Sequence, residues 1–160
     1  MIARWLTINV TVVFLIVLWS MLQKNESSTI LVAKIAAQGA FILFLTNLNM
    51  YFVFTFIRKS KQREVKIKLA KIAKRLMKFH IPIAFTATLF SIFHGVIMVD
   101  VNWFHLKQAK PISGIFTIFL LSIVLFSGFL RRRKATGRRR KFHYLTAFTF
   151  FGLLLLHIFL

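Results

Sequence analysis

The sequence predicts an all-α fold, a multipass membrane bundle of five transmembrane helices that forms one integral membrane domain over residues 1–160. Of these residues, 58% are hydrophobic and 20 are phenylalanine, a composition far from that of a soluble domain. Five apolar runs come close to or exceed the ~20 residues that a helix needs to cross a bilayer. Because the runs lack the alternating pattern of a membrane β-barrel, helices are expected throughout.

Short connections join the five expected spans. The first run continues for a full span and has no small-x-small cleavage site after Leu18 or Leu22, so we expect a retained helix rather than a secretion signal. The expected spans cover residues 5–22, 30–57, 80–99, 112–130 and 142–160.

Positive charge is concentrated in two of the connections. The formal net charge is +20, and ten of the 23 Lys and Arg residues lie in 58–78 and eight in 131–141. The positive-inside rule assigns both connections to the cytoplasm. The N-terminus is then inside, and the loops near Glu26 and Asp100 and the C-terminus are outside. This distribution argues against nucleic-acid binding and indicates that the basic residues contact anionic lipid headgroups.

The first basic connection, at about 58–79, also carries an amphipathic pattern. Two interpretations fit it, a helix lying at the cytoplasmic interface or an inward extension of the third span. Pro82 is expected at the junction, in the first turn of the membrane helix, where its missing N–H is best tolerated. The apolar stripe has spacings of three and four and consists of Val65, Leu69, Ile72, Leu76 and Phe79.

Composition excludes several classes of function. The chain contains no cysteine, so it has no thiolates for an iron–sulfur cluster, a disulfide or the covalent attachment of haem. All three acidic residues are expected in connections, which leaves no carboxylate relay of the kind used by ion pumps. The six glycines do not cluster into a phosphate-binding loop.

Histidine is the residue type with a pattern. Four of the five histidines open and close two similar segments, KFHIPIAFTATLFSIFH at 78–94 and KFHYLTAFTFFGLLLLH at 141–157. Fourteen helical residues rise ~21 Å and turn to within ~40° of four full turns, so both histidines of a segment share one face. The third and fifth spans are expected to be parallel. The inner histidines then lie at one depth and the outer histidines at another, giving the pairs His80 with His143 and His94 with His157.

Two facing imidazoles at one depth are typical of bis-histidine haem ligation between membrane helices. We therefore expect two non-covalent haem b groups (iron protoporphyrin IX), with these four histidines as the metal ligands. Ala84 and Ala147 follow the inner histidines by four residues and leave room for the porphyrin, while Gly95 and Gly152 admit close approach at the outer haem. The cations expected beside the inner propionates are Lys78, Lys141, Arg138, Arg139 and Arg140, and those on the outer side are Lys107 and Lys110.

This arrangement resembles the dihaem b-type cytochromes, namely the ferric reductase-like transmembrane family and, more distantly, the cytochrome b subunit of quinol-oxidising complexes. The resemblance covers the third to fifth spans. It implies an oxidoreductase component that transfers electrons across the membrane from a cytoplasmic or quinol donor to an outer acceptor. We expect the protein in a bacterial plasma membrane. In that family a flavin- and nicotinamide-binding domain often follows a sixth helix, and this sequence contains neither. The donor is therefore expected to be a separate partner, such as a cytoplasmic flavoprotein, another membrane subunit or a quinone.

Other interpretations stay open at this point. The chain is alternatively a haem-free small subunit or scaffold of a larger complex, or a haem carrier or sensor. His105, in VNWFHLK, fits an outer loop residue or part of an outer acceptor or quinone site. Four polar residues in the first two spans fit interhelical hydrogen bonds, or a quinone contact for one of them: Asn9, Gln38, Asn47 and Asn49.

Overall fold

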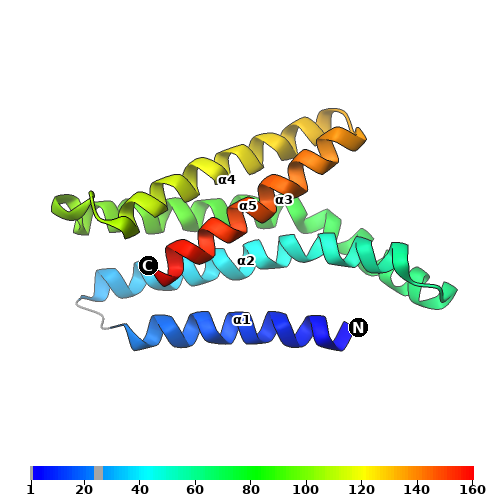
Figure 1. The fold of residues 1–160 in the computed structure, drawn as a ribbon, viewed down its shortest axis with the longest axis horizontal. Coiled ribbons are helices and arrows are strands. Elements are labelled where there is room, and N and C mark those ends of the chain that lie inside the picture. The colour runs from blue at the N-terminus through cyan, green and yellow to red at the C-terminus, as the bar shows by residue number, and fades with distance from the viewer. Residues whose placement is uncertain (1, 24–26) are drawn as a thin grey trace.

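The computed structural model describes residues 2–23 and 27–160, and within these ranges it contains helices and short connections but no strand. The predicted all-α fold is therefore confirmed. The loop expected near Glu26, which includes Lys24, lies outside the described residues. The elements are α1 (Ile2–Leu22), α2 (Ser28–Lys59), α3 (Arg63–Val101), the single 3₁₀ turn η1 (Trp103–His105), α4 (Ala109–Arg133) and α5 (Gly137–Phe159) (Figure 1).

All five α-helices are long and apolar enough to cross a membrane, as the sequence predicts. They alternate in direction, so that α1, α3 and α5 run one way and α2 and α4 the other (Figure 1). The α2–α3 and α4–α5 connections consequently lie at the same end of the bundle. Both highly basic segments, around 58–78 and 131–141, are thus gathered at that end.

Helix α3 differs from the prediction at its beginning. It runs unbroken for 39 residues from Arg63, so the amphipathic segment is an extension of the third span rather than a separate interfacial helix. The prediction that Pro82 opens a helix was wrong, because Pro82 lies in the interior of α3. Glu64 and Asp100, expected in connections, lie in the first and last turns of this longer helix.

Packing against α2 explains which residues of this extension are buried. Ala73 is only 3% exposed and packs against Met50 and Val53 of α2. In contrast, Ile72 is 49% exposed and Phe79 is 54% exposed. Ile72 and Phe79 of the predicted apolar stripe are therefore not buried against α2, because the small Ala73 takes the position that packs against this helix.

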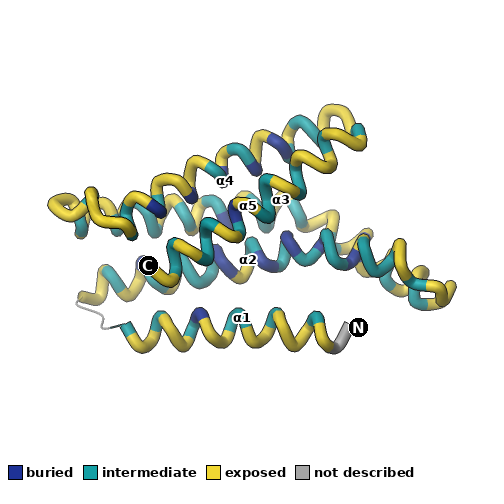
Figure 2. Tube along the Cα trace, viewed as in Figure 1, coloured by how far each residue is buried: buried dark blue, intermediate teal, exposed yellow. Residues whose placement is uncertain are grey.

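Two helical hairpins make up most of the bundle, since α2 packs along α3 and α4 packs along α5, whereas α1 touches α2 more sparsely. Buried positions are confined to short inward stretches, and exposed positions run along every helix (Figure 2). Many of the exposed residues are large and apolar, including Phe85, Phe119 and Phe126. An apolar exterior of this extent suits contact with lipid chains rather than water.

Candidate functional site

A large cavity extends through the bundle and is lined by residues of all five helices. Its volume is about 2080 Å³, whereas a site for one small ligand usually encloses ~300–1,000 Å³. Arg58 and Arg140 line it at the end with the basic connections, and Lys110 and Trp103 line it at the other. The cavity is therefore large enough for two sizeable groups placed one after the other along the helices.

All four paired histidines line this cavity. The ring centroids of His80 on α3 and His143 on α5 are 6.3 Å apart, and the ring planes are inclined at 76°. Those of His94 and His157, on the same two helices, are 6.4 Å apart and inclined at 71°. The structure thus brings the four side chains together in the two pairs that the fourteen-residue spacing predicts.

The two centroid separations can be compared with the separation expected when one metal ion is bound between two imidazoles. A bond from a first-row metal to an imidazole nitrogen is ~2.0–2.1 Å long, and that nitrogen lies ~1.1 Å from its ring centre. One iron between two facing imidazoles therefore separates the centroids by ~6.2–6.4 Å. Both observed separations fall in this range, so each pair has the spacing of two axial ligands to one metal.

In three of the four histidines, Nδ1 is hydrogen-bonded to a residue other than the paired histidine. The Nδ1 of His94 lies 3.0 Å from the carbonyl oxygen of Ala33, and that of His143 lies 2.8 Å from Oγ of Ser127. The Nδ1 of His157 lies 2.9 Å from Oγ of Ser113. Metal-bound histidines usually donate their second ring N–H to such acceptors, so these contacts suit ligation through Nε2.

His80 is the exception. Its Nδ1 is buried and has no hydrogen-bond partner among the residues that the structure describes. Its backbone carbonyl accepts a 3.0 Å hydrogen bond from Nδ2 of Asn47 on α2. This bond fixes α3 to α2 at the level of the inner pair.

The number of ligands also bears on the kind of metal group. Within 2–23 and 27–160 no group of three or more His, Cys, Asp or Glu side chains is arranged to hold a metal ion. A structural or catalytic zinc site uses at least three protein ligands. A haem carries its own equatorial nitrogens and needs only axial ligands from the protein. Isolated pairs of histidines therefore fit a haem better than a zinc site.

The small residues predicted near the haems are placed differently from one another. Ala84, Ala147 and Gly95 line the cavity. A Cβ added to Gly95 would lie 3.3 Å from Cδ1 of Ile118, so this glycine permits close approach to α4. Gly152 is exposed, does not line the cavity and has open space around it. We therefore leave Gly152 out of the site.

The predicted cations also separate into two groups. Arg140 and Lys141 line the cavity, whereas Lys78, Arg138 and Arg139 do not. Arg139 instead donates to the carbonyl oxygen of Leu130 at 2.8 Å and so secures the end of α4. At the opposite end, Lys110 lines the cavity and Lys107 does not. Three further arginines line the basic end and were missed by sequence reasoning, namely Arg58, Arg131 and Arg132.

Serine and glycine residues of α4 were missed as well. Ser113 and Ser127 reach the α5 histidines, and each is followed by a glycine that lies against the same imidazole. The signal was present in the sequence, because the two Ser-Gly pairs are fourteen residues apart, the same interval as the histidines. No residue of α4 is itself a histidine, so the histidine spacing alone does not point to this helix.

The remaining polar residues are mostly used between helices. Asn49 donates to Oδ1 of Asn9 at 2.8 Å, which links α2 to α1, and Asn47 links α2 to α3. These interhelical hydrogen bonds were predicted. Gln38 lines the large cavity, so a quinone contact at this residue stays a prediction. His105 is exposed in η1 and does not line the cavity.

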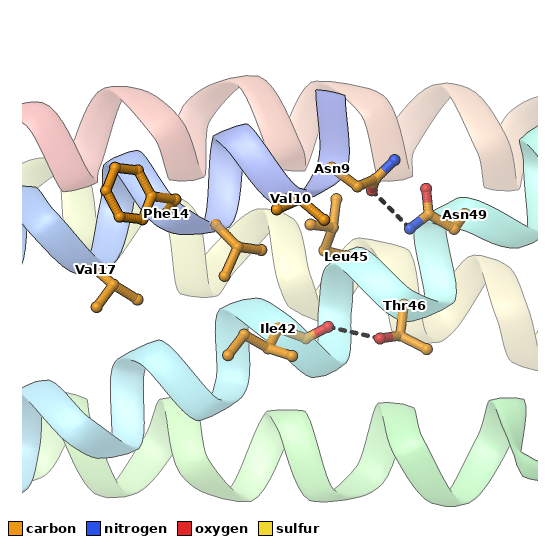
Figure 3. A pocket seen from close by; sticks show the side chains of 9 residues that line it. Asn9, Val10, Phe14, Val17, Ile42, Leu45, Thr46 and Asn49 are labelled. Carbon is orange, nitrogen blue, oxygen red and sulfur yellow. Dashed lines mark hydrogen bonds between the residues drawn. The ribbon is translucent and has the colours of Figure 1, made fainter. Parts of the chain in front are cut away.

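A second pocket, of about 500 Å³, lies between α1 and α2 (Figure 3). The side chain of Asn49 points from α2 toward Asn9 on α1, and the hydroxyl of Thr46 donates to the carbonyl oxygen of Ile42 within α2 at 2.8 Å. The rest of its lining is apolar. Its polar side chains thus bond one another or their own helix, in keeping with a seam between packed helices.

Comparisons with protein-family models, with characterised proteins and with solved structures gave no match for this chain. Over the part of the chain that the structure describes, the fold therefore defines the class only as an all-helical protein with five helices able to span a membrane. The particular function has to be inferred from the histidine pairs and the cavity that contains them.

Proposed function

We propose that this protein is a b-type cytochrome of a bacterial plasma membrane, which binds two non-covalent haems and transfers electrons between the two membrane surfaces. One observation carries the proposal: the ring centroids are 6.3 Å apart in one histidine pair and 6.4 Å apart in the other, and all four side chains line a single cavity. Along each helix the members of the two pairs are ~21 Å apart. That distance suits one haem toward each surface of a ~30 Å hydrocarbon layer.

His80 and His143 would hold the inner haem, with Ala84 and Ala147 leaving room for its ring. Arg140 and Lys141, together with Arg58, Arg131 and Arg132, line the cavity at this end. Arginine and lysine form strong charge-assisted hydrogen bonds with carboxylates. They are therefore suited to the propionates of a haem whose ring lies among the apolar residues deeper in the bundle.

His94 and His157 would hold the outer haem, with Gly95 beside the first of them. Lys110 and Lys34 line this end of the cavity and are the cations suited to the outer propionates. The outer end has fewer cations than the inner end, so the two sites differ in charge.

A bound haem supplies reversible one-electron chemistry. The chain would supply two histidine imidazoles to hold each haem. A haem held by two histidines would favour electron transfer over oxygen activation. The apolar helices surround the site with a medium of low dielectric, and the histidine spacing would set the separation of the two haems along the membrane normal.

The orientation that we propose has the N-terminus inside and the C-terminus outside. It is supported by the two basic connections, which lie at one end of the bundle (Figure 1) and belong in the cytoplasm by the positive-inside rule. At ~1.5 Å per residue, the 39 residues of α3 extend ~58 Å, well beyond a ~30 Å core. The basic part of α3 would then contact anionic headgroups and the cytoplasm.

The donor would deliver electrons at this basic cytoplasmic face, or from the membrane as a quinol. A cytoplasmic flavoprotein with an acidic docking surface suits the first route, because opposite charges accelerate encounter. An outer acceptor would receive the electrons beyond the pair His94 and His157. Gln38, which lines the cavity, is the candidate contact for a quinone.

The experiment that tests this function is a haem analysis of the purified chain. The protein is expressed with a supplied haem precursor, so that haem synthesis does not limit loading, and is purified in detergent. The dithionite-reduced minus oxidised spectrum is expected to show a b-type α band, and the pyridine haemochrome is expected to give about two haems per chain. A chain that carries no b-type haem under these conditions is not a cytochrome, and a ratio near one leaves a single-site carrier or sensor.

A further inference from the structure

Helix α4 contains no histidine, yet its sequence carries a repeat with the same interval as the paired histidines of α3 and α5. Ser113-Gly114 and Ser127-Gly128 are fourteen residues apart, which puts both on one face of the helix, ~21 Å apart. Because α4 and α5 run in opposite directions (Figure 1), the first Ser-Gly pair meets the second histidine of α5 and the second pair meets the first.

The contacts at the two levels are nearly the same. Oγ of Ser113 lies 2.9 Å from Nδ1 of His157, and Oγ of Ser127 lies 2.8 Å from Nδ1 of His143. Both serines are buried, with exposed fractions of 7% and 0%. The glycine that follows each serine makes room for the same ring. A Cβ at Gly114 would lie 3.0 Å from Cε1 of His157, and one at Gly128 would lie 3.4 Å from Cε1 of His143.

Counting protons determines which atom donates. A serine hydroxyl has one proton, and Ser127 gives it to the carbonyl oxygen of Val124 at 2.7 Å. Ser113 likewise gives its proton to the carbonyl oxygen of Lys110 at 2.7 Å. In this arrangement each hydroxyl accepts from the histidine, and at His157 the carbonyl oxygen of Lys110 is a second acceptor, 3.1 Å from Nδ1. Nδ1 of both α5 histidines must therefore carry the proton, which leaves the lone pair of Nε2 available in the cavity.

We infer that Ser113 and Ser127 are positioning residues that set the tautomer and the ring orientation of His157 and His143, and that Gly114 and Gly128 let α4 approach these rings. The role of the rings as iron ligands rests on the proposed function, whereas their tautomer does not. An acceptor on Nδ1–H makes the imidazole a stronger electron donor, which stabilises ferric over ferrous iron. Each serine thus lowers the potential of one haem.

Substitution of single serines tests this inference. Ser127→Ala is expected to raise the midpoint potential of the inner haem alone. Ser113→Ala is expected to raise that of the outer haem alone and by less, because the carbonyl oxygen of Lys110 still accepts from Nδ1 of His157. The matched control is Ser122→Ala, because the Ser122 hydroxyl also bonds its own helix, at 3.1 Å from the carbonyl oxygen of Ile118, but is exposed and bonds no histidine. A serine variant that shifts both potentials or neither, or that matches Ser122→Ala, would overturn the assignment.

A second measurement needs no haem and no variant. Nitrogen NMR of the full chain with ¹⁵N-labelled histidine, in nanodiscs, is expected to show a protonated Nδ1 and an unprotonated Nε2 for His143 and His157. Protonation at Nε2 instead would overturn the inference even in a protein with two haems. The predicted tautomers in a chain that binds no haem would support the serine contacts and remove the cytochrome, so the two proposals can fail separately.

Discussion

The imidazole of His80 on α3 lies 6.3 Å from that of His143 on α5, although these two helices pack mainly against other partners. α3 packs along α2, and α5 packs along α4. The width of the gap between the two rings is therefore set by residues that hold each hairpin together. Substitutions at those hairpin contacts should change haem binding without touching either ring.

Asn47 is the first such residue. Replacing it with Leu removes the 3.0 Å hydrogen bond to the carbonyl oxygen of His80, and hydrogen bonds between membrane helices contribute ~0.6 kcal/mol on average and up to ~1.7. We expect the inner haem to dissociate several-fold faster, with the outer haem unchanged, as measured by transfer of haem to an excess of apomyoglobin.

The control for Asn47 is Asn49→Leu. Asn49 bonds Asn9 on α1 at 2.8 Å, so this substitution loosens α1 from α2 and leaves the His80 carbonyl bonded. Equal loss of the inner haem in both variants would show that the effect is a general destabilisation of the bundle.

The two glycines of α4 should respond unequally to alanine. A Cβ at Gly114 would lie only 3.0 Å from Cε1 of His157, whereas one at Gly128 would lie 3.4 Å from Cε1 of His143, which is close to ordinary contact. Gly114→Ala is therefore expected to displace His157 and remove most of the outer haem, while Gly128→Ala retains the inner haem. Haem content and the reduced spectrum measure both effects.

Gly152→Ala is the reference for that comparison, because no described residue lies within 4 Å of the added Cβ and alanine favours a helix over glycine by ~1 kcal/mol. Both haems should remain in this variant. Loss of the outer haem from Gly152→Ala, or from Gly128→Ala but not Gly114→Ala, contradicts the observed packing of α4 on α5.

The arginines of the basic end separate into those that line the cavity and those that do not. Arg140 lines it and Arg138 does not. Arg140→Gln should lower the inner haem potential by tens of millivolts, since one charge at an effective dielectric of ~20 contributes on the order of 1–2 kcal/mol, and cations favour the ferrous state. Arg138→Gln should leave it nearly unchanged. Redox titration of both variants decides this, and equal shifts would mean that the cavity lining does not govern the potential.

Topology can be tested directly because the chain has no cysteine. Single cysteines at Gln62 and Ala135 should react with a membrane-impermeant maleimide only after the inner surface is exposed, whereas one at His105 should react in intact cells. All three positions are exposed in the structure. Labelling of Gln62→Cys and Ala135→Cys from opposite sides would rule out the parallel arrangement of α3 and α5 in the membrane.

Much of the fold followed from the sequence because length and apolar character define a membrane helix by themselves. The pairing of His80 with His143 followed for a similar reason, since fourteen residues nearly complete four turns. The same helical geometry excludes Gly152 from the predicted haem site. It lies nine residues after His143, a rotation of ~900° that puts it on the opposite face of the helix.

Contacts between helices account for what the sequence did not reveal. The burial of Ala73 in place of Ile72 depends on how closely α2 approaches α3. The propionate contacts were predicted from nearness in the sequence to His80 and His143. Arg131 reaches the same end of the cavity from the end of α4, a position that only the antiparallel packing of the two helices makes apparent.

The most direct test of the account is the pairing of the ligands. His80→Ala and His143→Ala should each remove the same haem and leave the other with its original spectrum and potential, and His94→Ala and His157→Ala should each remove that other haem. His105→Ala, at the exposed fifth histidine, should retain both. If His80→Ala and His143→Ala remove different haems, or if either variant keeps both haems, the two-pair site proposed here is incorrect.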